Sequence, residues 1–309
     1  MSRKFVSVLV AFAMIASNTV AAPAIAGGPP KTISTSLMNG QQSRTVQILV
    51  AQNEIKANIN DSNLGLGFAV FGGLLGGLVG GVIQASQNSS RSKKAEALIS
   101  PIRESLVGFD TDVLAKSTAE GSLSKVLWLS GTQSSFGRDS SPSGKVAILD
   151  AAQTDQVVFV EYTYDMSPNF DSVRVGVSIQ IANRANPSAK PGTKFKPEDR
   201  IKPKNLAYAQ NMIAIVTLPK SDPKKKELNA AAWAANNGEL VRRALTQAFG
   251  RAGELLPRTM ALTDADIKGF NDKKNPKRSY LNLSGRLVSD YGNGYLFWAK
   301  QFVLVESLK

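Results

Sequence analysis

The sequence predicts an α+β fold, in which a mainly antiparallel sheet packs against helices and a Gly-rich apolar helix of transmembrane length precedes them. Residues 173–181 alternate apolar and polar side chains with a period of two, which is typical of a strand with two different faces. An apolar stripe with helical spacing follows between residues 241 and 256. Strands and helices do not alternate regularly, which disfavours a doubly wound parallel sheet.

The N-terminus has the features of an export signal. Two basic residues precede an apolar run over residues 5–16, a small-x-small site ends at Ala26, and no acidic residue occurs before Glu54. The run is too short to span a hydrocarbon core of about 30 Å. We therefore expect a signal peptide over residues 1–26, cleaved near Ala26. Its removal lowers the formal net charge from +13 to +11.

The chain contains no Cys and no His. These absences exclude imidazole and thiolate catalysis, ordinary zinc sites, disulfides and lipid-modified cysteines. The carboxylates of Glu161 and Asp165 are four residues apart on a predicted strand, or about 13 Å. Carboxylate pairs in glycosidases lie about 5–9.5 Å apart. We therefore expect no enzyme, no cofactor and no metal. A hydrolase that uses carboxylates or a Ser/Lys pair stays open as an alternative.

Residues 64–83 are apolar, and the wider stretch from Ser62 to Ser90 contains no charged residue. Twenty helical residues span about 30 Å, the thickness of a hydrocarbon core. Small residues recur every four positions, so that a helix would carry flat ridges for close helix packing. The two rows are Gly65, Ala69, Gly73, Gly77 and Gly81, and Gly72, Gly76 and Gly80.

Residues 72–81 resemble the glycine-zipper segment of bacterial envelope proteins, and the resemblance extends over residues 65–81. The resemblance implies that the segment embeds in a membrane and promotes self-association. Several zipper families are lipoproteins, and this way of anchoring is not transferred because the chain has no Cys. The alternative is a Gly-rich loop or a buried apolar hairpin in a soluble domain.

The predicted domain organisation follows from these segments. A short β-rich segment over residues 27–63 precedes the glycine-zipper segment (64–85), and an α+β domain over residues 92–309 follows it. If the apolar segment crosses a membrane once, the basic residues after position 90 place the C-terminal domain in the cytoplasm and residues 27–60 outside. The export signal favours the envelope for the C-terminal domain instead.

The remaining elements follow from periodicity, caps and breakers. The predicted strands lie at residues 46–50, 125–129, 157–164, 173–181, 212–216, 281–288 and 295–305. The predicted helices lie at residues 95–106 with a kink at Pro101, at 113–115 after an Asp110 cap, and at 225–256, with an interruption at 236–238 and an end at Pro257. Turns are expected at 167–169 and 291–294 and a loop at 131–144, and the polar face of 173–181 is expected to be the wetter one.

The positive charge is concentrated in one region. Residues 184–226 hold eleven basic and three acidic residues, a local charge of +8. Four prolines make residues 183–205 an extended loop, and a second basic cluster lies at residues 268–278. Aromatic residues are too sparse there for base stacking, which makes nucleic acid an unlikely partner. The residues expected to contact an anionic partner are Lys194, Lys196, Arg200, Lys202, Lys204, Lys224, Lys225 and Lys226.

Together these features predict a non-enzymatic protein of the bacterial cell envelope, periplasmic and membrane-associated. It would form homo-oligomers through the glycine zipper and present a cationic loop to membrane lipid or an anionic envelope polymer. The main alternative is a soluble periplasmic binding or assembly module in which residues 64–83 pack internally.

Overall fold

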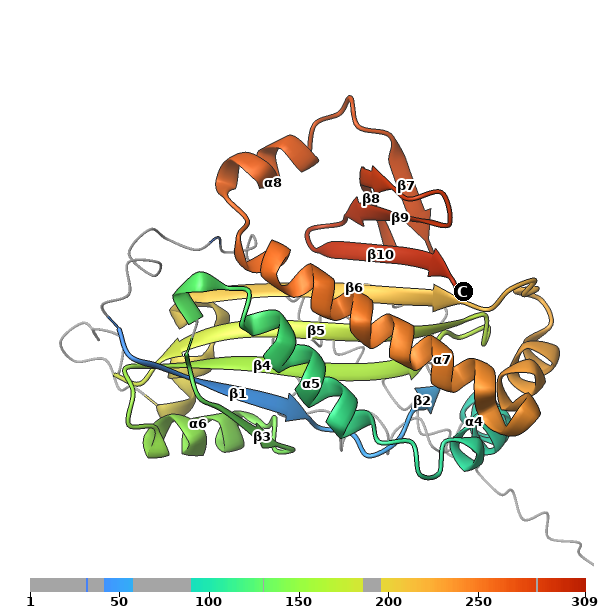
Figure 1. Cartoon of the computed structure of the whole chain (residues 1–309), viewed down its shortest axis with the longest axis horizontal. Helices are drawn as coiled ribbons and strands as arrows, with labels where there is room; N and C mark the ends of the chain where they lie inside the picture. Colours follow the sequence, from blue (N-terminus) through green and yellow to red (C-terminus); the bar gives the residue numbers. More distant parts are fainter. Residues whose placement is uncertain (1–31, 33–41, 58–89, 130, 186–195, 282) are drawn as a thin grey trace, which may run out of the picture.

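A computed structural model describes residues 32, 42–57, 90–129, 131–185, 196–281 and 283–309. Among these residues, ten strands form one sheet, with helices against it (Figure 1). The strands are β1 (Arg44–Val50), β2 (Lys56–Ala57), β3 (Ser134–Gly137), β4 (Gln156–Met166), β5 (Ser172–Asn183), β6 (Tyr208–Thr217), β7 (Lys277–Tyr280), β8 (Leu283–Asp290), β9 (Gly294–Trp298) and β10 (Phe302–Ser307). The α-helices are α4 (Ser90–Ser105), α5 (Thr111–Leu123), α6 (Pro142–Ala151), α7 (Lys226–Met260) and α8 (Asp264–Phe270). Short 3-10 helices lie at η1 (Leu127–Leu129), η2 (Pro197–Ile201) and η3 (Pro203–Asn205).

The strand order is β3-β1-β4-β5-β6-β10-β9-β8-β7, and β2 pairs with β4. The long strands β4, β5 and β6 are antiparallel neighbours, as are β7 to β10 in turn. β1 runs parallel to β3 and β4, and β10 runs parallel to β6. The predicted sheet packed against helices is confirmed, with parallel strands added to its antiparallel centre.

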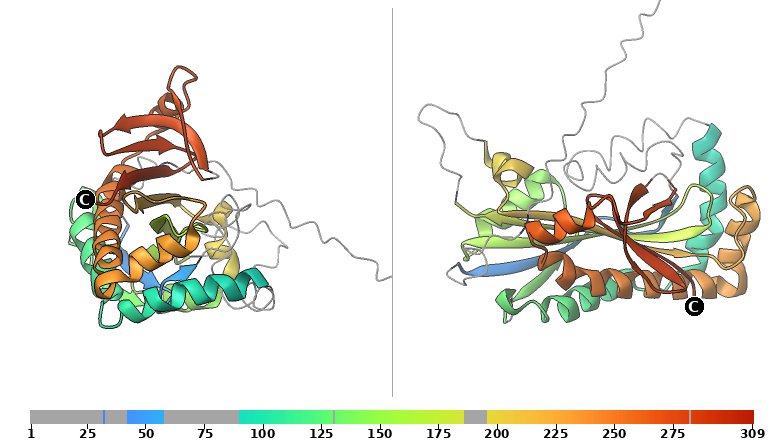
Figure 2. Two further views of the ribbon diagram at one scale, coloured as in Figure 1. Left: turned by 90° about the vertical axis from the view of Figure 1, so that its right-hand side faces the viewer. Right: turned by 90° about the horizontal axis from the view of Figure 1, so that it is seen from above.

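Helices cover both faces of this sheet. Figure 2 shows α5 and α7 on one side and α6 with η2 on the other, while α4 crosses one end. The stripe from Val241 to Leu256 is buried against β5 and β6, as predicted. On the other face, Leu149 of α6 packs in a cluster with Phe159. The central strand β5 is therefore buried on both faces.

That burial overturns the expectation of a wetter polar face on residues 173–181. Arg174 and Ser178 are each only 1% exposed, and Gln180 is 8% exposed. Alternation of polar and apolar residues indicates that the two faces of a strand differ in polarity. The pattern does not indicate which elements cover those faces, because the covering helices come from distant parts of the chain.

The interruption of α7 is confirmed and has a clear backbone cause. Asn236, Asn237 and Gly238 have left-handed φ angles of 50°, 54° and 74°. The end predicted at Pro257 is wrong, since α7 continues to Met260. The last turn is held by tertiary contacts, because the Tyr208 hydroxyl donates to the Thr259 carbonyl (2.9 Å) and Met260 is fully buried.

Two helices near the N-terminus extend further than expected. α4 runs through Pro101, whose ring is exposed, while Ile99 and Ile102 on either side are buried. The cap at Asp110 is confirmed, because its carboxylate accepts the backbone N–H groups of residues 112 and 113. The helix that it starts continues to Leu123.

The strand predicted at residues 125–129 is wrong. Residues 127–129 form the 3-10 helix η1, and the Trp128 ring lies under the guanidinium of Arg44, 5.1 Å from its centre. The loop expected at 131–144 contains the edge strand β3 and the start of α6, which Ser141 caps by accepting the Gly144 N–H. Short Ser-rich and Gly-rich elements of this kind carry little periodicity.

The predicted C-terminal hairpin is present, with its turn at residues 291–294. The second predicted strand is divided into β9 and β10 by a tight turn around Lys300, whose φ is 60°. The sequence did not predict α8 or β7. The segment over residues 27–63 is not a separate unit in its described part, because β1 lies between β3 and β4 in the main sheet.

Candidate functional site

The residues predicted to form the zipper lie outside the described residues, as do the signal peptide and Lys194. These zipper positions are Gly65, Ala69, Gly72, Gly73, Gly76, Gly77, Gly80 and Gly81. Within the described ranges, no helix combines the length and apolarity needed to cross a membrane. The structure does describe the two elements that flank the segment, β2 before it and α4 after it.

Both flanks belong to one folded unit. Ala57 of β2 pairs with Met166 of β4, and α4 packs against β2 and α7. Arg103 of α4 donates from Nε to the Ile55 carbonyl (2.9 Å), which joins the two flanks directly. Strands of one sheet cannot lie on opposite sides of a membrane. The single-crossing alternative, with residues 27–60 on one side of a membrane and the C-terminal domain on the other, is therefore incompatible with this sheet.

One end of the sheet gathers the flanks and several loops, and we call it the β2 end. The β4–β5 turn lies there, where Trp233 donates from Nε1 to the Phe170 carbonyl (2.7 Å). The β6–α7 loop lies beside this turn, because the Leu218 N–H donates to the Asp171 carbonyl (2.8 Å). The β2 end occupies the right-hand side of Figure 1.

The β2 end is basic. Its lysines come from α4 and from the β6–α7 loop, and they are Lys93, Lys94, Lys220, Lys224, Lys225 and Lys226. All but Lys226 are exposed, and Lys226 is half-buried. Two acidic residues counter them: Glu227 binds Lys94 (2.8 Å) and Asp222 lies 3.6 Å from Lys225. The hydrogen bond from Lys94 lowers the pKa of Glu227. The charge pattern of the sequence predicted only Lys224, Lys225 and Lys226 from this group, although Lys93 and Lys94 follow the apolar segment closely.

The other predicted basic residues lie elsewhere. Lys196, Lys202 and Lys204 are exposed before β6, whereas Lys224 follows it, so the ten-residue strand separates them by about 30 Å. Arg200 is buried, with Nη2 2.7 Å from Asp150 of α6 and Nη1 donating to the Arg184 carbonyl. Its predicted role in contacting an anionic partner is wrong, because its charge holds η2 against α6.

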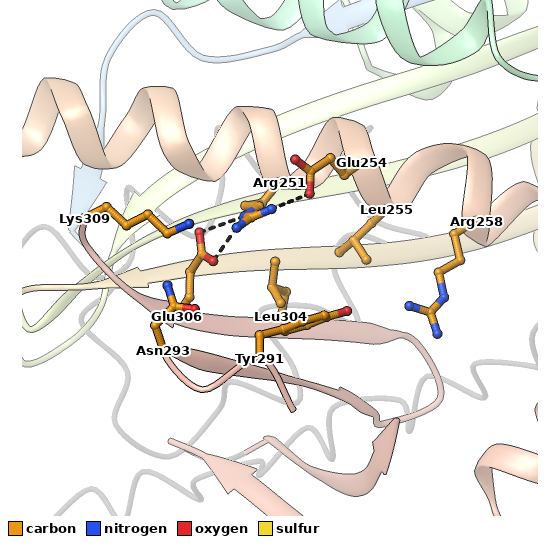
Figure 3. A pocket seen from close by; sticks show the side chains of 9 residues that line it. All are labelled: Arg251, Glu254, Leu255, Arg258, Tyr291, Asn293, Leu304, Glu306 and Lys309. Carbon is orange, nitrogen blue, oxygen red and sulfur yellow. Dashed lines mark hydrogen bonds and ion pairs between the residues drawn. The ribbon is translucent and has the colours of Figure 1, made fainter. Parts of the chain in front are cut away.

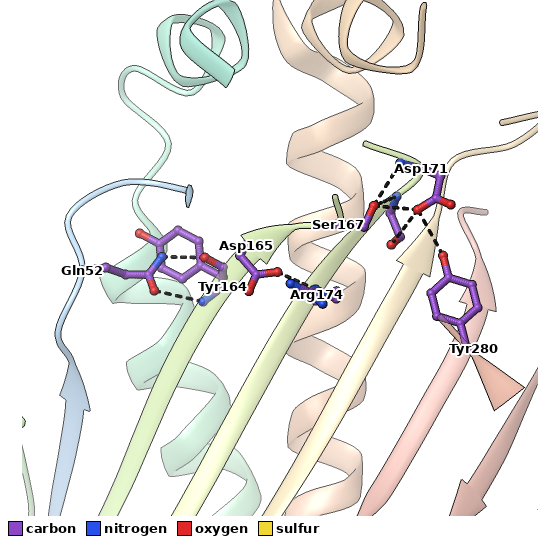
Figure 4. A network of polar contacts seen from close by, with 8 residues as sticks. Gln52, Tyr164, Asp165, Ser167, Asp171, Arg174 and Tyr280 are labelled. Carbon is purple, nitrogen blue, oxygen red and sulfur yellow. Dashed lines mark hydrogen bonds and ion pairs between the residues drawn. The ribbon is translucent and has the colours of Figure 1, made fainter. Parts of the chain in front are cut away.

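Charged residues also cross the sheet at the β2 end (Figure 4). Asp165 of β4 accepts a hydrogen bond of 2.5 Å from Nε of Arg174, its cross-strand neighbour on β5. Burial raises the pKa of Asp165, and the Arg174 charge opposes that rise. Lys56 of β2 is the neighbour of Asp165 on the opposite side of β4 from Arg174. Burial lowers the pKa of Lys56, and the charge of Glu54 opposes that change.

The other carboxylate of the predicted pair has its own cation. Glu161 lies 2.7 Å from Nζ of Lys145, which also donates to Gln180 (3.2 Å) and lies over the Phe159 ring. Glu161 and Asp165 therefore each form a separate ion pair, and this arrangement does not resemble an acid–base pair. Within the ranges described, no group of three or more acidic residues is placed to hold a metal ion.

A polar network ties β7 to the β4–β5 turn (Figure 4). Asp171 accepts hydrogen bonds from the hydroxyl groups of Ser167 (2.6 Å) and Tyr280 (3.3 Å). The Ser167 oxygen in turn accepts the backbone N–H groups of Asp171 and Ser172. Burial raises the pKa of Tyr280, which therefore stays a donor to Asp171. The network fixes the turn that supports the β2 end.

No family model, curated protein or solved structure matches the chain. The strongest indications of function are therefore the sequence and the geometry of the β2 end. There, exposed lysines lie at the same end of the sheet as β2 and α4, the two elements that flank the uncharged apolar stretch.

Proposed function

We propose that this chain is an exported, non-enzymatic protein of the bacterial cell envelope. It contacts a membrane through residues 64–83 and self-associates through the small residues of that segment. The observation that supports this proposal is the position of the β2 end. The flanks of an uncharged stretch of about membrane length lie in one folded unit, beside a cluster of exposed lysines.

The two features act on a membrane in the same direction. Burial of apolar side chains favours insertion, and each lysine near an anionic leaflet contributes about 1 kcal/mol. Because both flanks lie on one side, the apolar segment enters and leaves the membrane from that side. The proposal therefore replaces the single crossing with a contact made from one face of the bilayer.

Replacement of residues 58–89 with a 12-residue Gly-Ser linker tests membrane contact. Arg103 lies beside Ile55, and Ser90 is thirteen residues earlier on α4, or about 20 Å away. A 12-residue Gly-Ser linker has a mean span of about 19 Å, so it can join the flanks without strain. We expect the variant to keep its far-UV circular dichroism and lose flotation with vesicles that contain phosphatidylglycerol.

Two outcomes of this experiment contradict the proposal. Flotation of the linker variant at the level of the full chain would show that another surface binds the membrane. Loss of the folded spectrum would show that residues 64–83 pack inside the domain, as in a soluble periplasmic assembly module. Fractionation of expressing cells adds the test of export, since the proposal requires the chain in the envelope fraction.

Substitution of Gly72, Gly76 and Gly80 with Ile tests self-association, because the added side chains prevent close helix packing. We expect cross-linked oligomers to disappear in detergent while flotation persists. Substitution of Leu74, Leu75 and Leu78 with Ile is the matched control, since it changes shape without filling the Gly rows. Unchanged oligomers in the Gly variant would contradict the zipper.

A further inference from the structure

A groove of about 430 Å³ lies between the second half of α7, the β8–β9 turn and β10 (Figure 3). Its volume is in the range of small-ligand sites. Leu255 and Leu304 form its apolar floor, and each is 5% exposed. Tyr291, from the β8–β9 turn, is 50% exposed and lies beside Leu304. The groove therefore offers an accessible aromatic ring over an apolar floor.

At one end of the groove, the two side-chain carboxylates are already paired. Arg251 donates from Nε to both carboxylate oxygens of Glu306 (3.0 and 3.1 Å) and from Nη1 to Glu254 (2.5 Å). Gln247 also donates to Glu306, which is 2% exposed. The hydrogen bond to Glu306 raises the pKa of Arg251. Both side-chain carboxylates that line the groove are thus bound to Arg251, and neither is available to a ligand.

At the other end, Arg258 has a different environment. Its guanidinium lies 5.1 Å from the centre of the Phe302 ring, which holds it in place without neutralising it. Among the described residues, no carboxylate lies within ion-pair distance of Arg258. The nearby Asp266 is committed to α8, because its Oδ2 accepts from the Thr263 N–H and hydroxyl group. Arg258 is exposed, and Figure 3 shows the Tyr291 hydroxyl on the Arg258 side of the groove.

We propose that this groove binds a ligand in which a phosphate or carboxylate group is joined to an aromatic or aliphatic portion. The planar guanidinium of Arg258 donates to the anionic group, with the geometry that suits two parallel hydrogen bonds. Tyr291 and Leu304 contact the apolar portion. This site does not depend on the membrane contact proposed above, so either proposal can fail alone.

The test measures binding to the full chain in non-ionic detergent by isothermal titration calorimetry. The probes are phenyl phosphate, phenylacetate and short-chain phosphatidic acid, with inorganic phosphate and phenol as single-feature comparisons. We expect at least one of the first three to bind tenfold or more tightly than either comparison. Preference for the phosphatidic acid identifies a lipid headgroup as the source, and preference for the aromatic anions identifies a soluble ligand.

Variants then locate the site. We expect Arg258→Gln to weaken binding at least tenfold, Arg258→Lys to weaken it less, and Tyr291→Ala to weaken binding of the aromatic probe. Lys268→Gln removes an exposed charge on α8 outside the groove and should change affinity less than twofold. The proposal is overturned if no probe binds saturably, if phenol binds as well as phenyl phosphate, or if Lys268→Gln and Arg258→Gln lose affinity equally.

Discussion

The Nζ atom of Lys145 lies 2.7 Å from Oε2 of Glu161, and the two side chains are only 7% and 1% exposed. The pair joins α6 to the centre of β4. Desolvation of two charges offsets most of their attraction, so a buried pair of this kind contributes little net stability. Its effect is to fix one position of α6 over the sheet, because a shift would leave each charge buried without its partner.

This pair predicts strongly non-additive effects of mutation. Glu161→Met leaves the buried Lys145 charge without a carboxylate and should lower the free energy of unfolding by about 3–5 kcal/mol. Substitution of both residues with Met removes both charges at similar volume and should restore most of that loss. Urea unfolding measures both variants and the Lys145→Met single variant. A double variant whose loss equals the sum of the two single losses would contradict this account.

Asp165 predicts a specific pH dependence. Its pKa is raised by burial, so the folded state binds its proton more tightly than the unfolded chain does. Its contribution to stability is therefore largest below the unfolded pKa of about 3.9 and is lost as the pH rises through the folded value. Relative to Asp165→Asn, the wild type should lose stability as the pH rises from below the unfolded pKa through the raised folded pKa. A difference that moves in favour of the wild type over this range would show that the Arg174 charge outweighs burial.

Gly238 and Gly250 of α7 form a matched pair for alanine substitution. Gly238 has a φ of 74°, and a Cβ there would lie 2.3 Å from the Ser105 hydroxyl oxygen, so Gly238→Ala should cost about 2 kcal/mol or more. A Cβ at Gly250 meets no described atom within 4 Å, and Gly250→Ala should stabilise the helix by up to about 1 kcal/mol. Thermal unfolding measures both variants. Equal shifts in the melting temperature would contradict the close approach of α7 to Ser105 of α4 at Gly238.

The lysines of the β2 end predict a position-dependent response to anionic membranes. Substitution of Lys93, Lys224 and Lys225 with Gln should weaken binding to vesicles with phosphatidylglycerol at least tenfold. The control is the same substitution of Lys196, Lys202 and Lys204, which are equally exposed but lie beyond the other end of β6. Added salt should remove the difference between the two triple variants. Equal losses would indicate that only total charge matters.

Local signals in the sequence predicted the elements that carry strong periodicity or caps. The alternation in β5, the apolar stripe of α7 and the Asp110 cap each depend on neighbouring residues, and the structure confirms all three. Pro101 and Pro257 are local helix breakers, but tertiary packing on both sides of each keeps the helix intact. Those contacts come from residues far away in the sequence.

The same limit applies to the candidate site. The basic residues of 184–226 form one charged run in the sequence, but β6 places them at opposite ends of the sheet. Arg200 is buried in an ion pair with Asp150. Lys93 and Lys94 join the β2 end only because α4 packs against α7. A charge count along the chain cannot predict either spatial arrangement. The groove at Arg258 is equally hard to predict, because three separate segments of the chain form it.

The position of β1 has a consequence for the order of events during synthesis. Arg44 of β1 donates to Gln156 of β4, and 112 residues separate them along the chain. At translation rates of about 5–20 residues per second, β1 waits roughly 6–20 seconds for its central partner. Pairing across so long an interval is also slow in itself, because the loop between the strands must be closed first. The apolar stretch is made within that interval, so it can find a chaperone or a bilayer before the sheet exists.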